Sequence, residues 1–133
     1  MTATNKMKIL IVDDHPAMLT MLRQILKQLG FSNVLEAENA ERALAMLSQD
    51  EICMVFTDLG LPAMSGIEFI QQIRQNSATR ELPVIVLSGI SEQETVVQAL
   101  KAGADNFIVK PCSAKIIKEK LVQVLSKRAQ SVS

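Results

Sequence analysis

The sequence predicts an α/β fold in which a parallel sheet of five strands is covered by helices on both faces. Five short runs of almost continuous apolar residues recur along the chain, as expected of parallel strands that are buried on both sides. A segment with apolar residues at helical spacing follows each run, so strands and helices alternate throughout. Right-handed crossovers then bring the carboxyl ends of all five strands to one edge.

The first strand and helix are expected at residues 7–14 and 16–30. The strand is apolar until it ends in the acid pair Asp13 and Asp14. The helix is predicted to end at Gly30. Its apolar residues at helical spacing are Met18, Leu22, Ile25 and Leu29.

The second strand is expected at residues 33–38, where apolar and polar residues alternate as at a sheet edge. Asn39 is predicted to cap the helix that follows, which runs to residue 49. The residues that this helix is expected to bury are Ala43, Leu44 and Leu47.

The third strand covers residues 52–56 and leads into Asp58. Ser65 and Glu68 form a capping-box pattern for a helix over residues 65–76. A carboxylate directly after a buried strand either begins a turn or is presented at a site, and the rest of the chain has to decide between these readings.

The fourth strand is expected at residues 83–89. Ser91 and Glu94 repeat the capping-box pattern for a helix that ends at Gly103.

The fifth strand is expected at residues 106–111, and Ser113 is predicted to open the last helix. The apolar face of that helix comprises Ile117, Leu121, Val124 and Leu125. The resulting domain spans residues 7–127, with flexible termini at residues 1–6 and 128–133.

Composition narrows the class of protein. The 133 residues are 48% hydrophobic, with no apolar run of membrane-spanning length and no signal-peptide pattern, so we expect a cytoplasmic protein without a membrane partner. The 14 basic and 14 acidic residues balance, which argues against direct nucleic acid binding. Cys53 and Cys112 are interpreted as reduced packing thiols, and with His15 as the single histidine no zinc site is expected.

Acidic, hydroxyl and basic side chains end four of the five strands. Each alone has an ordinary structural explanation, but together they would line one edge of the sheet, where such folds bind ligands. These residues are Asp13, Asp14, Asp58, Ser88 and Lys110.

Clustered carboxylates at that edge need cations. Two unit charges ~4 Å apart interact by about 4 kcal/mol at an effective dielectric of 20, so three carboxylates together are unfavourable. Lys110 supplies one positive charge. The remainder suits Mg²⁺ (or Mn²⁺), which takes oxygen ligands and often shares its shell with phosphate. A metal ion and an ammonium beside a carboxylate indicate a phosphoryl acceptor.

Four linked motifs make the chain closely resemble a bacterial two-component response-regulator receiver domain, from Lys8 to about Leu125. They are ILIVDDHP, TDLGLPAMSG, VIVLSG and ALKAGADNFIVKP. The resemblance implies a flavodoxin-like, doubly wound sheet of strand order 2-1-3-4-5 with five helices. It also implies phosphorelay signalling in which Asp58 accepts a phosphoryl group from a sensor histidine kinase or a histidine phosphotransfer protein. Such a module is not an enzyme, although it assists its own phosphorylation and dephosphorylation.

The same resemblance implies roles for the site residues. Asp14, Asp58 and the backbone carbonyl of Gly60 would ligate Mg²⁺, while Asp13 acts through a metal-bound water. Lys110 would pair with the phosphoryl oxygens or with Asp58.

The resemblance further implies a switch. Ser88 would move towards the phosphoryl group and Phe107 would turn inward, reshaping the surface of the fourth helix, fifth strand and last helix, where partners dock. Without the resemblance, core packing would be the preferred interpretation of Phe107. The Lys110–Pro111 bond is expected to be cis.

Three further residues flank the expected site in the sequence. Gly60 has no side chain and Ile90 cannot hydrogen-bond, so we hypothesise that neither orients a hydrolytic water and that the phosphorylated form decays slowly. His15 lies beside the acid pair, but imidazole is not a favoured Mg²⁺ ligand, and we interpret it as a surface residue at a helix start.

The sequence is compatible with two architectures. One is a stand-alone regulator, and the other is the receiver of a longer regulator with a DNA-binding output domain. An aspartyl-nucleophile phosphohydrolase is disfavoured because Gly60 stands where a second Asp would be expected. The sequence allows a monomer or a phosphorylation-linked dimer that acts on a downstream protein.

Overall fold

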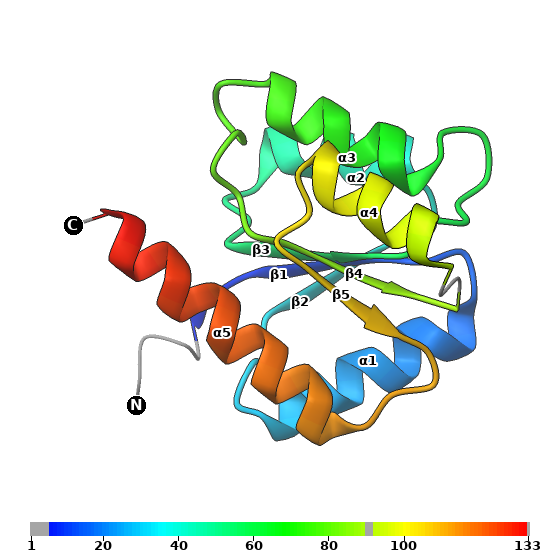
Figure 1. Cartoon of the computed structure of the whole chain (residues 1–133). Helices are drawn as coiled ribbons and strands as arrows, with labels where there is room; N and C mark the ends of the chain where they lie inside the picture. The colour runs from blue at the N-terminus through cyan, green and yellow to red at the C-terminus, as the bar shows by residue number, and fades with distance from the viewer. Residues whose placement is uncertain (1–5, 90–91, 133) are drawn as a thin grey trace.

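The computed structural model describes residues 6–89 and 92–132, with side chains as far as residue 127. Within these ranges the chain forms one five-stranded parallel sheet of order β2-β1-β3-β4-β5, which confirms the expected order (Figure 1). The strands are β1 (Ile9–Val12), β2 (Val34–Ala37), β3 (Met54–Thr57), β4 (Val84–Ser88) and β5 (Asn106–Val109). The helices are α1 (Pro16–Gln28), α2 (Ala40–Gln49), α3 (Gly66–Gln75), α4 (Gln93–Ala102) and α5 (Ala114–Val132).

The helices form two layers around the sheet. Helices α2, α3 and α4 cover one face, and α1 and α5 cover the other (Figure 1). Successive strand residues therefore enter different cores: Leu10 packs with the first group of helices, while Ile9 and Ile11 pack with the second. Because both faces are covered, the central strands need apolar residues at every position, which is the pattern that predicted them.

Side-chain caps fix the start of three helices. The Asn39 side chain accepts from the backbone N–H of Arg42 at 2.8 Å. Ser65 and Glu68 form the predicted capping box, with bonds of 3.2 and 3.3 Å. Ser113 Oγ accepts from the backbone of Ile116 at 3.3 Å.

The predicted cap of α4 is wrong. Glu92 occupies the N-cap and makes no side-chain capping bond in the described chain. Ser91, which was expected there, lies outside the described residues.

Four other expectations are adjusted. The buried residues of α1 are Leu19, Leu22 and Leu26; of the expected set, Leu22 is among them, while Met18, Ile25 and Leu29 are partly buried against the same core. Strand β3 begins at Met54, so Cys53 is exposed and is not a packing thiol, whereas Cys112 packs partly against the core of α1 and α5. Helix α5 continues to Val132, past the expected domain end at residue 127. Strand β2 occupies an edge as predicted, but its burial does not alternate.

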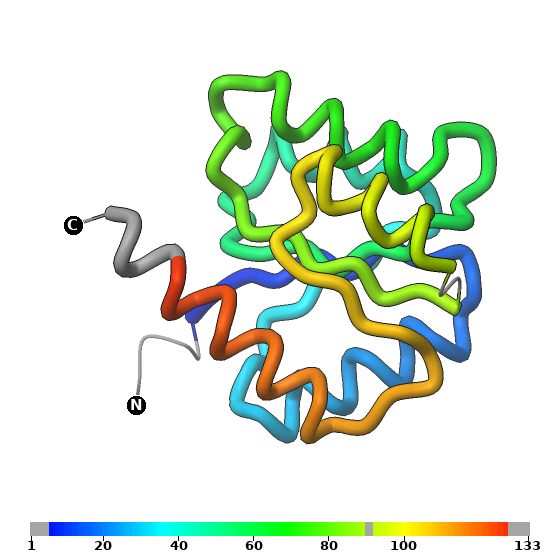
Figure 2. The backbone as a smooth tube through the Cα atoms, in the orientation of Figure 1, coloured from blue at the N-terminus to red at the C-terminus, as the bar shows by residue number. Residues whose placement is uncertain are grey.

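The backbone path brings each strand back in the same direction. Figure 2 shows the chain leaving the sheet at one edge after every strand and returning to the opposite edge through a helix. Side chains that follow the strands are thereby gathered on one edge, and this edge holds the site described next. Within the described ranges, no helix combines the length and the apolar character that a bilayer crossing requires.

Candidate functional site

Backbone ladders hold the predicted residues at the carboxyl edge of the sheet. The N–H of Asp13 donates to the carbonyl of Ala37 at 3.1 Å, and that of Asp58 donates to the carbonyl of Val12 at 3.0 Å. The N–H of Lys110 donates to the carbonyl of Ser88 at 2.9 Å. Each strand pairing thus continues one residue beyond the strand, so the polar side chains sit on a fixed backbone.

The ammonium group of Lys110 joins two buried carboxylates. Its Nζ donates to Asp13 Oδ2 at 2.7 Å and to Asp58 Oδ2 at 3.1 Å. The other oxygen of Asp58, Oδ1, accepts from the backbone N–H of Leu59 at 2.7 Å. Asp58 is only 7% exposed, and both oxygens of its carboxylate accept hydrogen bonds.

Gly66 allows helix α3 to begin in close contact with the backbone of Asp58. A Cβ at this position would collide with the carbonyl oxygen of Asp58 and would come within 2.6 Å of the Cα of Leu59. The N–H of Gly66 instead donates to the carbonyl of Leu59 at 2.9 Å, which closes the loop after β3.

The surroundings keep Asp58 ionised. Burial by itself would raise the pKa of Asp58, but hydrogen bonds from Ser88 and Lys110, the charge of Lys110 and the Leu59 N–H together lower it. Burial would likewise lower the pKa of Lys110, but its bonds to Asp13 and Asp58 raise it. At neutral pH the site therefore holds an ionised Asp58 carboxylate and a charged Lys110 ammonium.

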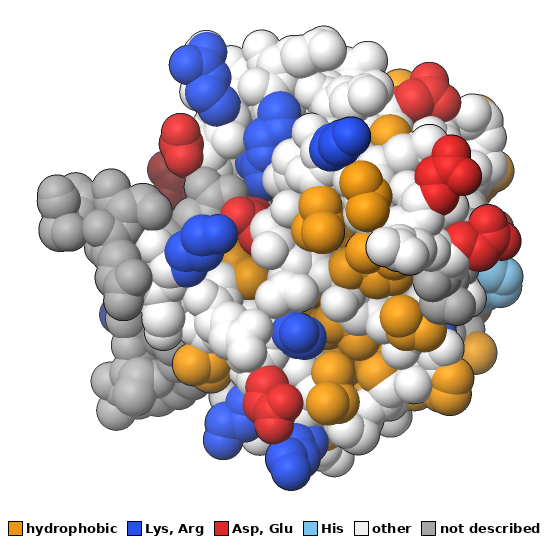
Figure 3. Space-filling view, viewed as in Figure 1, with side chains coloured by type: hydrophobic (Ala, Val, Ile, Leu, Met, Phe, Trp, Pro, Cys, Tyr) orange, Lys and Arg blue, Asp and Glu red, His pale blue; other side chains and the backbone are white. Residues whose placement is uncertain are grey.

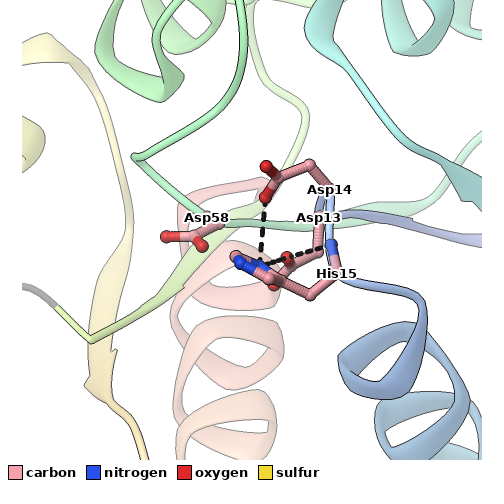
Figure 4. Close-up of side chains that lie close together, drawn as sticks. All are labelled: Asp13, Asp14, His15 and Asp58. Atoms are coloured by element: carbon pink, nitrogen blue, oxygen red, sulfur yellow. Dashed lines mark hydrogen bonds and ion pairs between the residues drawn. The ribbon is translucent and has the colours of Figure 1, made fainter.

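Asp14 and His15 form the outer wall of the site. The His15 ring nitrogen Nδ1 lies 2.8 Å from Asp13 Oδ1 and 3.1 Å from Asp14 Oδ1, and both contacts are drawn in Figure 4. The hydrogen bond to Asp13, followed by the charges of Asp14 and Asp13, raises the pKa of His15. The side chain of Asp13 is buried, whereas those of Asp14 and His15 are 36% and 67% exposed, so the cluster opens to solvent on this side.

The donor set fits a divalent cation. One ligand atom from each of Asp13, Asp14, His15 and Asp58 can be chosen so that all lie within 4.8 Å of one another. Three carboxylates against the single ammonium of Lys110 leave an excess of negative charge, and carboxylate oxygens are the ligands that Mg²⁺ prefers.

Comparisons with known proteins agree with this geometry. Residues 9–122 match the model of the response regulator receiver domain. The chain belongs to this family. It is 37% identical over 121 residues to the chemotaxis protein CheY-3 of Vibrio cholerae serotype O1, covering 91% of this chain and 93% of that protein.

Solved receiver structures share the fold. A CheY-like response regulator receiver domain protein from Methanospirillum hungatei JF-1 superimposes with a TM-score of 0.85 at 30% identity, over 94% of this chain and 98% of that one. The receiver domain of a sensor histidine kinase from Pseudomonas aeruginosa PAO1 has a TM-score of 0.82 at 23% identity, over 90% and 98%. That second structure has a magnesium ion coordinated in its active site cleft.

This receiver domain functions in phosphorelay signalling and is a signalling protein rather than an enzyme. The family implies a histidine kinase as its partner. The acidic cluster is consistent with the Mg²⁺ site of receiver domains.

The structure brings most of the predicted site residues together. Asp13, Asp14, Asp58 and Lys110 lie within one cluster, and Ser88 bonds to Asp58. Phe107 lies away from the cluster on β5, half-buried against the core of α2–α4. The backbone N–H of Gly60 points at Asp58 Oδ1, at 3.4 Å. Ile90 lies outside the described residues, and Lys110–Pro111 is cis as expected.

Two contacts were not predicted from the sequence. Lys110 pairs with Asp13, 97 positions away, as well as with Asp58, and His15 folds back onto both acids. No local pattern marks the first contact. The second had a signal, because a histidine directly follows the acid pair.

Proposed function

We propose that Asp58 is the phosphoacceptor and that its carboxylate takes the phosphoryl group from a phosphohistidine. The observation that supports this assignment is the position of the Lys110 ammonium, which contacts Asp58 Oδ2 and Asp13 Oδ2 together. Asp13 also bonds to Lys110, but of the three acids it is Asp58 that in addition accepts hydrogen bonds from Ser88 and from the backbone N–H of Leu59. Asp58 therefore has its charge balanced and its orientation fixed before the donor arrives.

In the proposed reaction an oxygen of Asp58 attacks phosphorus. The O–P bond forms, the N–P bond of the phosphohistidine breaks, and the imidazole leaves with the bonding electron pair. The ammonium of Lys110 offsets charge on the phosphoryl oxygens, and the hydroxyl of Ser88 exchanges its bond to the carboxylate for one to a phosphoryl oxygen.

The cation belongs beside this acceptor. Asp14, Asp58 and the carbonyl oxygen of Gly60 would hold Mg²⁺, with Asp13 acting through a bound water. When bound, the ion supplies positive charge next to the transferring group. The similar kinase receiver that binds magnesium in its cleft supports this placement.

Intact-mass analysis after treatment with acetyl phosphate and Mg²⁺ tests the acceptor. We expect the wild-type chain to gain the mass of one phosphoryl group and Asp58→Asn to gain none. Asp50→Asn is the matched control, since Asp50 lies at the other end of the sheet, between α2 and β3, in a half-exposed ion pair with Lys8. Phosphorylation that persists in Asp58→Asn and is lost in another Asp variant would move the acceptor.

We also propose that phosphorylation alters the face of α4, β5 and α5, where a downstream protein docks. All the large apolar side chains that are markedly exposed in the described chain lie on these three elements: Val97, Leu100, Val109, Ile116 and Val122. Figure 3 shows apolar side chains gathered over this face with basic ones at its margin. We expect a protein target rather than a nucleic acid, with a monomer or a phosphorylation-linked dimer as the active form.

Phe107 provides the readout of this switch. Among the four phenylalanines, Phe31, Phe56 and Phe69 are buried, and Phe107 alone is half-exposed. In ¹⁹F NMR of fluorophenylalanine-labelled protein, acetyl phosphate should shift the Phe107 resonance most and should leave Asp58→Asn unchanged. An unaltered Phe107 signal in fully phosphorylated protein would refute the switch.

The phosphorylated form is proposed to decay slowly because Gly60 and Ile90 offer no group to orient water. A Cβ on Gly60 would meet nothing within 4 Å, so a polar side chain fits there without displacing a neighbour. Gly60→Asn and Ile90→Glu should each accelerate loss of the phosphoryl group. Rapid hydrolysis in the wild type would end this proposal.

A cytoplasmic location completes the proposed function. Cys53 and Cys112 are both free thiols, as is usual in reducing compartments.

A further inference from the structure

His15 is placed to act as a metal ligand. We propose that its imidazole completes the acidic site as a ligand for first-row transition-metal ions such as Ni²⁺ and Zn²⁺, and that the site binds these ions more tightly than Mg²⁺ because of it. The inference rests on the proposed metal site and adds both a ligand and a class of ion to it, with Asp13 Oδ1 as a direct ligand of these ions in place of the water-mediated contact proposed for Mg²⁺.

The distances suit a shared ion. His15 Nδ1 lies 2.8 Å from Asp13 Oδ1 and 3.1 Å from Asp14 Oδ1. Adjacent ligands of an octahedral ion at 2.0–2.1 Å are about 2.9 Å apart, so the hydrogen-bonded spacing between the ring nitrogen and the two carboxylates matches the spacing of ligands around one ion. Lys110 contacts the opposite oxygen of Asp13, Oδ2, and does not compete for Oδ1.

The backbone holds the ring in this place. His15 is the N-cap of α1, with Pro16 directly after it, and its N–H donates to Asp13 Oδ1 at 3.0 Å. The side chain is 67% exposed, so a small displacement of the ring to admit an ion disturbs no packed neighbour.

Ligand chemistry then sets the preference. Imidazole nitrogen suits nickel, copper and zinc, whereas Mg²⁺ favours oxygen. The ring therefore adds affinity for the transition-metal ions and adds little for Mg²⁺. The same chemistry that makes His15 a poor Mg²⁺ ligand makes it a good ligand for these ions.

NMR can observe the proposed bond directly, because His15 is the single histidine of the chain. In untagged, ¹⁵N-histidine-labelled protein, at a pH where the ring ¹⁵N shifts of the metal-free protein show a neutral imidazole, Zn²⁺ should shift the Nδ1 resonance and Mg²⁺ should not. Asp14→Asn should weaken the Zn²⁺ effect. The titrations use a Cys53→Ser background because an exposed thiol is a competing ligand.

Calorimetry separates this role from simple ion pairing. His15→Gln should lower the affinity for Ni²⁺ about tenfold or more and leave the affinity for Mg²⁺ within about twofold. If the ring only competes with cations for the carboxylates, His15→Gln will bind both ions equally well or more tightly, and the proposal fails. A wild type that binds Ni²⁺ through His15 but shows no Mg²⁺ binding would uphold the ligand and refute the proposed Mg²⁺ dependence.

Discussion

The two edges of the sheet each hold a partly buried cluster of charges, and the clusters differ in what remains unsatisfied. At the amino edge, Arg74 of α3 donates five hydrogen bonds of 2.6–3.1 Å: two to the carbonyl of Gly103, one each to those of Arg80 and Leu82, and one to Asp105. A guanidinium group has five N–H donors, so these bonds use all of its capacity.

At the carboxyl edge, by contrast, carboxylates outnumber the basic groups that pair with them. The ammonium of Lys110 pairs with Asp13 and Asp58, whereas Asp14 lies against His15 and is 36% exposed, so the cluster is open to solvent at Asp14. A cluster that satisfies itself has little to offer a ligand, whereas one with surplus charge and free lone pairs gains by binding one. The cluster at the amino edge therefore stabilises the fold, and the cluster at the carboxyl edge is suited to bind a ligand.

The largest effect is expected from breaking the amino-edge cluster. Arg74→Met should lower the free energy of unfolding by about 3 kcal/mol, because Asp105 and several carbonyl groups lose their charged partner in a region where the two side chains are only 17% exposed. Urea denaturation measures the change. Arg80→Met, which removes a neighbouring exposed arginine, should change stability by less than about 0.5 kcal/mol. Equal losses in the two variants would show that the Arg74 contacts are not special.

Mg²⁺ should raise the free energy of unfolding through the carboxyl edge alone, by less than the loss expected for Arg74→Met. At ten times its Kd, the ion should raise the free energy of unfolding of the wild type by about 1.4 kcal/mol, because it binds the folded state alone. Asp14→Asn should lose this increment, and chelation should reverse it in the wild type. Arg74→Met should retain the increment on its lower baseline. An increment that survives in Asp14→Asn would place the ion elsewhere.

The difference between the edges also explains what the sequence could predict. Strands and helices follow local periodicity, and the parallel arrangement then places Asp13, Asp58 and Lys110 on one edge without knowledge of any side-chain contact. Four of the five strand ends therefore indicated the site before its geometry was known.

The amino-edge cluster gave no comparable signal. Arg74 is one charged residue on an amphipathic helix, a position where arginine is ordinarily solvated, and its partners come from loops up to 31 residues away. Gly103 was predicted only as a helix end, yet a Cβ there would come within 2.6 Å of Arg74 Cγ. Such contacts depend on how α3, α4 and β5 pack together, which local pattern does not encode.

Titration provides a finer test of the carboxyl edge. The lowered pKa of Asp58 means that its ionised form stabilises the folded state above the ordinary value of 3.8, and that this contribution is lost as pH falls through the lowered value. Lys110→Met should raise the pKa of Asp58, so the loss would begin at higher pH. Carboxyl ¹³C NMR of the two proteins measures the shift, and an unchanged Asp58 titration would remove Lys110 as a cause.

The smallest predicted effect concerns backbone strain. Ala63, in the exposed loop after β3, has a φ of 64°, in the left-handed region that favours glycine. Ala63→Gly should raise the free energy of unfolding by about 0.5–1 kcal/mol, because the relief of strain exceeds the added freedom of the unfolded chain.

Gly103 makes the opposite comparison at the amino edge, since its φ is 123° and Arg74 fills the space that a side chain would need. Gly103→Ala should therefore destabilise the fold in the same urea experiment. If Ala63→Gly also destabilises it, the left-handed alanine is not a source of strain. If Ala63→Gly stabilises the fold and leaves phosphorylation by acetyl phosphate unchanged, the strained backbone at Ala63 has no role in the reaction. Destabilisation by Gly103→Ala would show that the packing of Arg74 at the amino edge requires a glycine at this position.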